Sequence, residues 1–243
     1  MTLETNFPSS AMVLAAGLGT RMRPLTNDQP KPLVKVAGKA LIDYTLDRFA
    51  AFGIDNVVVN VHYLADMLEE HLAMRTAPSI SISDEREVLL ETGGGITKAL
   101  PLLGTDPIFC TNTDAILFDE PIDEACATLA KAWDPHHMDA LLLLTPHTAA
   151  SGYDGAGDFH LEGDGRIAWR RGNSAPFIYT GLQIISPALF EGLSVEPFSL
   201  KTVWERADEE GRLHGVVHRG AWMHVGDPEG LKIAEERLAA FRQ

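Results

Sequence analysis

Short apolar runs alternate with stretches of helical periodicity along most of this chain. Continuous or β-branched apolar runs predict strands at residues 11–15, 56–61, 80–83, 107–111 and 140–145. Apolar positions at helical spacing predict helices at residues 41–52, 65–74, 95–103, 122–133 and 228–241. This alternation favours an α/β fold with a Rossmann-like, mostly parallel sheet flanked by helices.

The pattern changes after residue 145. Six glycines between residues 152 and 172 separate short polar stretches, which predicts loops and antiparallel hairpins, and a further strand is predicted at residues 178–185. No repeat or linker divides the chain. We therefore expect a mobile tail at residues 1–10 and a single domain at residues 11–243, with a smaller β-rich, sugar-binding lid at about 146–220.

Composition narrows the class of protein. The chain has 243 residues, of which 45% are hydrophobic and 22% charged, as in ordinary soluble domains. It has no apolar run long enough to span a membrane, and its first ten residues lack the features of a signal peptide. Cys110 and Cys126 lack metal-ligand spacing, so we expect small core residues in a reducing compartment. The sequence therefore predicts a cytoplasmic protein without a membrane partner.

The charge distribution points to an anionic ligand. The formal net charge of −14 argues against nonspecific binding of nucleic acid. Even so, Arg21, Arg23, Lys31 and Lys35 lie within fifteen residues that contain only one acid, Asp28. A local positive cluster in an acidic protein predicts a phosphate site.

The loop after the first predicted strand, LAAGLGTR at residues 14–21, fits such a site. Its two glycines, Gly17 and Gly19, offer backbone amides, while Arg21 and Lys31 supply charge, and prolines on both sides stiffen the lysine. This set suits a triphosphate; the alternative is an ordinary strand–helix turn with incidental surface cations. A dinucleotide-binding fingerprint is absent because Met22 stands where it needs its third glycine, which disfavours a nicotinamide oxidoreductase.

This loop, followed by PKPLVKVAGKALIDY at residues 30–44, resembles the G-x-G-T-R…K-P signature of the sugar-1-phosphate nucleotidyltransferases. The resemblance runs from about residue 11 to the C-terminal helix. Within the family it is nearest to the N-acetylmuramate-1-phosphate uridylyltransferases, on the stretches LETGGGITKALPLLG, GDFHL and TGLQIISPALFEG at residues 90–104, 157–161 and 180–192.

The resemblance implies transfer of a nucleotidyl group from UTP to N-acetylmuramate 1-phosphate, with release of pyrophosphate, in peptidoglycan recycling. No left-handed β-helix follows, so we expect no added acetyltransferase activity. Monomer and dimer both remain open. Two rivals are kept: a mannose-1-phosphate guanylyltransferase, or another hexose- or heptose-1-phosphate nucleotidyltransferase, and, in a different class, a non-catalytic nucleotide sensor.

By resemblance, Arg21, Lys31 and Asp114 are catalytic. Lys31 reaches the α-phosphate, and Asp114, which follows a buried predicted strand, ligates Mg²⁺. Glycines at residues 93–95 let the backbone approach the pyrimidine, although a glycine-rich helix entry explains them too. The implied nucleotide-binding set is Leu14, Ala15, Ala16, Gly17, Gly19, Thr20, Arg21, Lys31, Glu91, Thr92, Gly93 and Asn112.

Two segments depart from the family pattern. Residues 222–228 read WMHVGDP where W-x-D-V-G-T-P is usual, so His224 occupies the position of a metal-binding aspartate. Imidazole is a poor Mg²⁺ ligand but suits softer ions such as Mn²⁺. His224 thus ligates another metal or holds a metal-bound water, Asp227 replaces it as ligand, or the site is weakened. For Asp227 we favour a capping role on the helix that starts at Pro228.

The second departure concerns the sugar phosphate. By resemblance, Asp158, Thr180 and Gly181 contact the sugar phosphate. The Glu-Lys-Pro segment that many relatives use to hold the phosphate is missing, and Arg170 and Arg171 lie near its place. Arg171 is our candidate substitute, against the alternative of two ordinary surface arginines.

Overall fold

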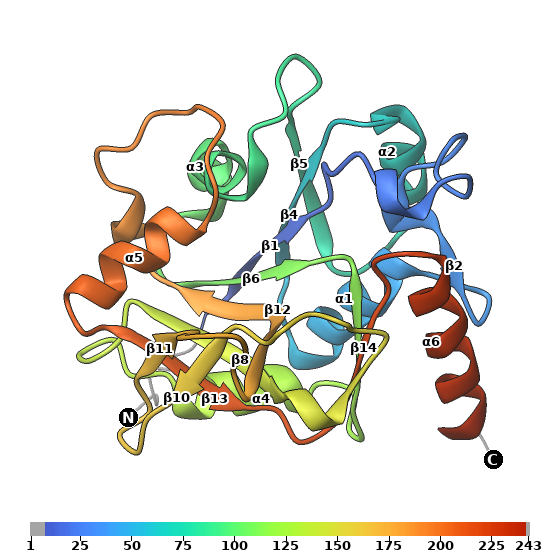
Figure 1. Cartoon of the computed structure of the whole chain (residues 1–243). Helices are drawn as coiled ribbons and strands as arrows, with labels where there is room; N and C mark the ends of the chain where they lie inside the picture. The colour runs from blue at the N-terminus through green and yellow to red at the C-terminus, as the bar shows by residue number, and fades with distance from the viewer. Residues whose placement is uncertain (1–7, 242–243) are drawn as a thin grey trace.

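A computed structural model describes residues 8–241, in which a central mixed sheet carries helices on both faces (Figure 1). The strand order is β11-β10-β12-β6-β1-β4-β5, with β8 also pairing with β12, and β13 with β8. The segment from β6 through β1 and β4 to β5 is parallel, whereas β12 is antiparallel to β6 and β8. The strands are β1 (Ser10–Leu14), β4 (Asn56–Val61), β5 (Ser79–Asp84), β6 (Ile108–Asn112), β8 (Ala140–Pro146), β10 (Phe159–Leu161), β11 (Ile167–Trp169), β12 (Phe177–Ile185) and β13 (Leu213–Val217).

Two small sheets stand beside the central one. In the larger, β14 pairs antiparallel with β7 and parallel with β9. The smaller is a hairpin of β2 and β3. Their bounds are β2 (Lys35–Val36), β3 (Lys39–Ala40), β7 (Ala115–Phe118), β9 (Ala150–Ser151) and β14 (Ala221–His224).

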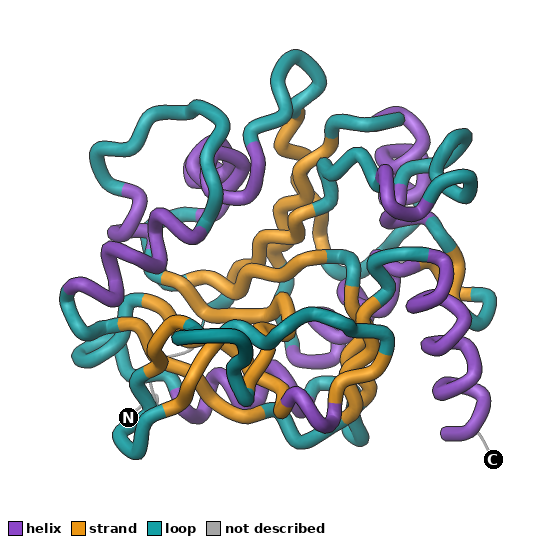
Figure 2. Tube along the Cα trace, in the orientation of Figure 1, coloured by secondary structure: helices purple, strands orange, loops and turns teal. Residues whose placement is uncertain are grey.

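Helices enclose the sheet because alternate strand residues point to opposite faces (Figure 2). Val57 and Val59 face one apolar core with α1 (Leu41–Phe52), α2 (Ala65–Ala73) and α4 (Glu124–Ala132). Met12 and Val58 face the other, with α3 (Glu91–Leu103) and α5 (Lys201–Glu209). Within residues 8–241, short 3₁₀ turns lie at Thr20–Met22, Lys31–Leu33, His147–Ala149 and Pro187–Phe190.

A third, smaller core supports the loop after β1. The last helix, α6 (Pro228–Phe241), stands at the right of Figure 1 and buries Ala234 and Leu238. These side chains pack in one cluster with Met22, Val34 and Val36, which flank Lys31 in sequence. The C-terminal helix therefore packs against the segment around Lys31 and supports the loop after β1.

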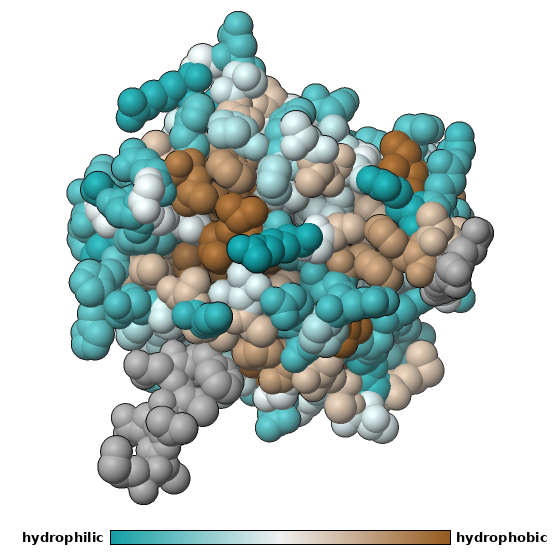
Figure 3. Space-filling view, turned by 90° about the horizontal axis from the view of Figure 1, so that it is seen from below, coloured by the Kyte–Doolittle hydropathy of each residue, from teal (hydrophilic) through white to brown (hydrophobic). Residues whose placement is uncertain are grey.

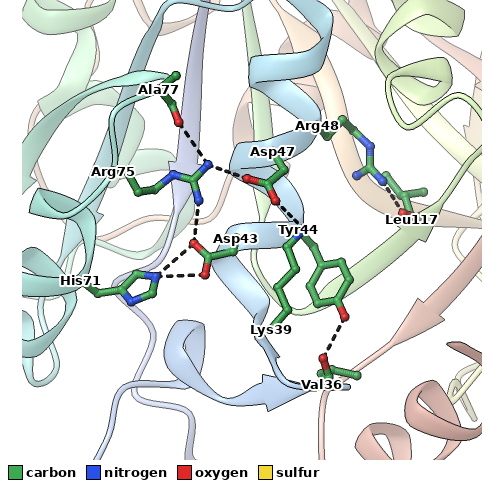
Figure 4. Close-up of polar contacts among 10 residues, drawn as sticks. All are labelled: Val36, Lys39, Asp43, Tyr44, Asp47, Arg48, His71, Arg75, Ala77 and Leu117. Atoms are coloured by element: carbon green, nitrogen blue, oxygen red, sulfur yellow. Dashed lines mark hydrogen bonds and ion pairs between the residues drawn. The ribbon is translucent and has the colours of Figure 1, made fainter. Parts of the chain in front are cut away.

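Charged side chains tie α1 to α2 (Figure 4). Arg75 donates to Asp43 at 2.9 Å and to Asp47 at 2.6 Å, and His71 lies 3.0 Å from Asp43. Lys39 pairs with Asp47 on its other side, at 2.6 Å. Because both carboxylates accept from more than one partner, this network fixes the two helices side by side.

The predicted α/β class is confirmed, and each predicted strand and helix is present within a few residues of its expected bounds. The helix expected at residues 95–103 begins earlier, at Glu91, so the three glycines lie inside α3. The strands β7, β13 and β14 and the helix α5 were not predicted.

The expected domain boundaries can be placed on this fold. Strands β10 to β13, from the segment predicted as a lid, hydrogen-bond into the central sheet. Residues 1–7 of the predicted tail lie outside the described residues, and Ser10 already belongs to β1. None of the described helices is long and apolar enough to cross a membrane. Hydrophilic residues surround separate small hydrophobic patches on the face shown in Figure 3.

Candidate active site

The carboxyl ends of β1, β4 and β6 open onto a cavity of about 480 Å³. Parallel strands end at the same edge of a sheet, which is where α/β folds place their ligands. The lining residues are Leu14, Ala15, Ala16, Gly17, Gly19, Thr20, Arg21, Lys31, Pro32, Asn60, Leu89, Glu91, Thr92, Asn112, Thr113, Asp114, Ser199 and Gly226.

Gly19 shapes the loop that forms one wall. Its φ of +63° lies in the left-handed region, which favours glycine. A Cβ here would also stand 3.0 Å from Cβ of Lys31 and 3.1 Å from Cγ2 of Thr26. The carbonyl of Gly19 accepts from the Thr26 hydroxyl at 2.8 Å. The glycine therefore lets the loop close onto the segment that carries the lysine.

Lys31 and Asp114 form an ion pair in this cavity, with Nζ 3.5 Å from Oδ2. Burial lowers the pKa of Lys31, and the charge of Arg21 adds to this, while Asp114 acts in the opposite direction. Burial also acts to raise the pKa of Asp114, but the hydrogen bond from His224 and the charge of Lys31 outweigh it, and the pKa lies below its usual range. Asp114 is therefore ionised at neutral pH.

A buried chain of hydrogen bonds joins the loop to the start of α3. The backbone N–H of Ala15 donates to Oδ1 of Asn60 at 2.6 Å, and Nδ2 of Asn60 donates to Oε1 of Glu85 at 2.7 Å. Oε2 of Glu85 accepts from the backbone of Leu90 at 3.1 Å. Gly95 of α3 packs against this chain, since a Cβ there would lie within 2.9 Å of both side chains.

His224 ends β14 beside Asp114, with its Nε2 3.8 Å from Oδ2. Its Nδ1 lies 3.3 Å from the carbonyl oxygen of Gly152. The imidazole stacks on Trp222 with an interplanar angle of 15°, and Tyr153 meets it edge-on. The ring is therefore held on three sides.

Asp227 serves as a helix cap, because its Oδ1 accepts from the backbone N–H of Gly230 at 2.8 Å. This contact agrees with the capping role that we favoured. In residues 8–241, no group of three or more His, Cys, Asp or Glu side chains is placed to hold a metal. Within this part of the chain, a metal ion would therefore take at most two side chains of these four types, and Asp114 and His224 are the pair that lies together.

A second cavity of about 320 Å³ adjoins the first and shares Thr92, Asn112 and Ser199 with it. Asp158 lines it, with Oδ2 accepting from the backbone of Tyr179 at 3.0 Å. Its other lining residues are Gly157, Phe159, Trp169, Arg170, Tyr179, Leu200, Lys201 and Trp204. Aromatic rings and two exposed cations thus surround this space.

Most of the predicted site residues come together, but six of them do not line either cavity. Gly93 packs against the ring of Phe198. Thr180 and Gly181 are buried in β12 at a bulge beside Asn112. Arg171 lines only a separate surface hollow, whereas its neighbour Arg170 lines both that hollow and the second cavity. The other two are His224, whose Nε2 lies 3.8 Å from Asp114 of the first cavity, and Asp227, which caps α6.

Sequence reasoning missed Asn60 and Lys201, and Ser199 at the junction. Asn60 had a signal, as the polar residue near the end of the apolar strand NVVVNV. Lys201 and Ser199 had none, because α5 was not predicted.

Residues 10–166 match the sequence profile of the family described as Nucleotidyl transferase. The chain is 51% identical to an N-acetylmuramate alpha-1-phosphate uridylyltransferase of Caulobacter vibrioides, over 96% of this chain and 98% of that protein. It is 35% identical to the protein of the same name from Neisseria meningitidis serogroup B, over 96% and 99%. The solved inositol-1-phosphate CTP transferase from T. maritima matches with a TM-score of 0.75 and 18% identity, over 94% of this chain and 96% of that one, which is a likeness of fold.

Proposed function

This chain belongs to the nucleotidyl transferase family, among the sugar-1-phosphate nucleotidyltransferases, and from that membership we propose that it transfers the uridylyl group of UTP to N-acetylmuramate 1-phosphate. The observation that carries the proposal is the meeting of Gly19, Arg21, Lys31 and Asp114 in one cavity next to a second, cationic one. The similarity to two proteins of that name supports the choice of substrates.

In the proposed reaction, a phosphate oxygen of the sugar 1-phosphate attacks the α-phosphorus of UTP. The bond from that phosphorus to the bridging oxygen breaks, and pyrophosphate leaves with its electron pair. Arg21 and Lys31 would neutralise the negative charge that grows on the phosphoryl oxygens. Lys31 is pre-positioned for this because Asp114 holds its ammonium.

Nucleotidyltransferases of this family use a divalent metal ion. Such an ion would neutralise and orient the triphosphate. Asp114 fits it, as an ionised carboxylate that lines the cavity. Both Mg²⁺ and Mn²⁺ are compatible with a carboxylate and phosphate oxygens.

The second cavity suits a sugar with two negative groups. N-acetylmuramate 1-phosphate carries a lactyl carboxylate in addition to its phosphate, and Arg170 and Lys201 bring two positive charges to this cavity. Neither cation makes an ion pair within the described chain. Asp158, whose Oδ2 is held by β12, leaves Oδ1 for a sugar hydroxyl. We therefore favour Arg170 over Arg171 as the substitute for the missing lysine. Because UTP is a cytoplasmic nucleotide, the proposal also locates the protein there.

The test is pyrophosphate release across a grid of UTP, GTP, CTP, ATP and dTTP with several sugar 1-phosphates, in Mg²⁺ and in Mn²⁺. We expect release with UTP and N-acetylmuramate 1-phosphate. Release only with GTP and mannose 1-phosphate would keep the chemistry and overturn the substrates. If the protein binds nucleotide but releases no pyrophosphate with any sugar 1-phosphate, the result would favour the non-catalytic nucleotide sensor, the rival that His224 motivates.

A variant tests the sugar assignment. Lys201→Met keeps the length of the side chain and removes its charge, so the KM for N-acetylmuramate 1-phosphate should rise by about 10-fold, as expected for the loss of one charged contact. The KM for N-acetylglucosamine 1-phosphate, which lacks the carboxylate, should rise much less. Equal increases for both sugars would contradict contact with the lactyl group. Arg171→Met is the matched control and should change neither constant.

A further inference from the structure

We propose that the metal centre of this protein is a mixed nitrogen and oxygen site, in which Nε2 of His224 and the carboxylate of Asp114 share one divalent ion, so that the centre selects Mn²⁺ over Mg²⁺. The inference rests on the proposed function, because the triphosphate supplies further oxygen ligands. It goes beyond that function by naming the second ligand and the class of ion.

The hydrogen bond at the far side of the ring sets which nitrogen is free. The carbonyl oxygen of Gly152 can only accept, so Nδ1 of His224, 3.3 Å away, must carry the hydrogen. Nε2 faces Oδ2 of Asp114, 3.8 Å away, and a divalent ion bound between them would take the place of a proton on Nε2. Two atoms that each lie about 2.1 Å from one ion are at most about 4.2 Å apart, so one ion can contact both.

The surroundings hold the ring in this orientation. Trp222 stacks on it with ring centroids 5.8 Å apart, and Tyr153 meets it edge-on at 6.1 Å. Gly226 leaves the room that it needs, because a Cβ at that position would stand 2.2 Å from Cε1 of His224. A backbone carbonyl on the second ring nitrogen is the usual support of a metal-binding histidine.

The donor set determines the choice of ion. Mg²⁺ prefers oxygen ligands and retains its water, whereas imidazole suits transition metals. Oδ1 of the nearby Asp227 caps α6, and among the described residues no third His, Cys, Asp or Glu side chain joins Asp114 and His224 to hold a metal. The site therefore offers one carboxylate and one imidazole.

Pulsed electron paramagnetic resonance of Mn²⁺ tests the inference without turnover. The full-length protein is mixed with Mn²⁺ and a non-hydrolysable UTP analogue, once unlabelled and once with ¹⁵N-histidine. We expect a nitrogen coupling from a directly bound imidazole that changes with the isotope. His224→Asn should abolish this coupling and weaken Mn²⁺ binding by at least about 10-fold. His137→Asn, at an exposed histidine, should change neither.

A second variant tests the choice of ion. His224→Asp provides two carboxylates and should shift the ratio of Mn²⁺ to Mg²⁺ affinity toward Mg²⁺ by about 10-fold or more. Absence of nitrogen coupling in the unmodified protein, or its survival in His224→Asn, would overturn the inference. Pyrophosphate release without such coupling would overturn this inference alone. Nitrogen coupling in a protein that releases no pyrophosphate with any sugar 1-phosphate would support the metal centre and refute the proposed function.

Discussion

Replacing Gly95 by alanine tests whether the buried chain of hydrogen bonds requires glycine at this position of α3. At a solvent-exposed position of a helix, replacing glycine by alanine stabilises the helix by about 1 kcal/mol. Here the new Cβ would stand 2.8 Å from Oε1 of Glu85 and 2.9 Å from Nδ2 of Asn60, two atoms that hydrogen-bond to each other. Both side chains are at most 2% exposed, so water cannot replace a lost bond.

The magnitude follows from three terms. Losing one hydrogen bond to a buried charged group costs about 1.5–3 kcal/mol. Crowding a packed site costs about 1–3 kcal/mol. After the helical gain is subtracted, we expect the free energy of unfolding of Gly95→Ala to fall by about 1.5–5 kcal/mol. UTP binding should weaken too, because Asn60 also holds the backbone of Ala15 at the cavity.

Equilibrium unfolding in urea measures the change, through the midpoint at constant slope. Gly163→Ala is the matched control, since a Cβ there meets nothing within 4 Å, and its free energy of unfolding should change by less than about 0.5 kcal/mol. A Gly95→Ala variant as stable as the unmodified protein would refute the argument.

Three further predictions concern other parts of the molecule. Lys31→Ala and Asp114→Ala should each lower the rate of pyrophosphate release by at least about 100-fold while the protein stays folded by circular dichroism; near-normal rates would remove our account of the charge stabilisation. Burial raises the pKa of the thiols of Cys110 and Cys126 to about 12, so Ellman's reagent at pH 8 should react with neither until the protein is unfolded, and rapid reaction of the native protein would contradict this. Burial acts to raise the pKa of Asp47, but Lys39 and Arg75 outweigh it and lower the pKa, so its stabilisation is present above the unfolded pKa and lost as pH falls through the folded one. Melting temperatures of Asp47→Asn should therefore lie below those of the unmodified protein at pH 7 by an amount that shrinks between about pH 5 and pH 3, whereas a constant difference would exclude the carboxylate as its cause.

The elements that sequence reasoning found are those whose apolar pattern is long or continuous. The strand β8 buries six consecutive side chains, and the helix α1 buries apolar side chains at helical spacing, so both patterns are clear in the sequence. In contrast, β7 and β14 have only four residues each, which is too short for a period to appear. The helix α5 buries only Val203, Trp204 and Ala207 among polar residues.

Sequence reasoning predicted the site residues that belong to one short motif, and it missed features that depend on contacts between segments far apart in the sequence. Gly19 and Lys31 belong to one motif, and the structure brings them into contact. From the sequence, Gly93 and Gly94 were expected to precede the helix that begins at Gly95, because glycine disfavours helix interiors. They are helical because segments far away in the sequence pack closely against them: Phe198 against Gly93, and the carbonyl of Glu196 against Gly94.

The packing of α6 against the loop after β1 has a consequence for protein synthesis. During synthesis, the loop that carries Lys31 leaves the ribosome early. Met22 and Val34 can pack against Ala234 and Leu238 only after α6 has left the ribosome as well. A chain that stops before residue 228 retains every charged group proposed for the triphosphate, yet it leaves this small core open to water. The support of the active loop is therefore completed last, and loss of the final helix by premature termination or proteolysis would disable a site whose residues are all still present.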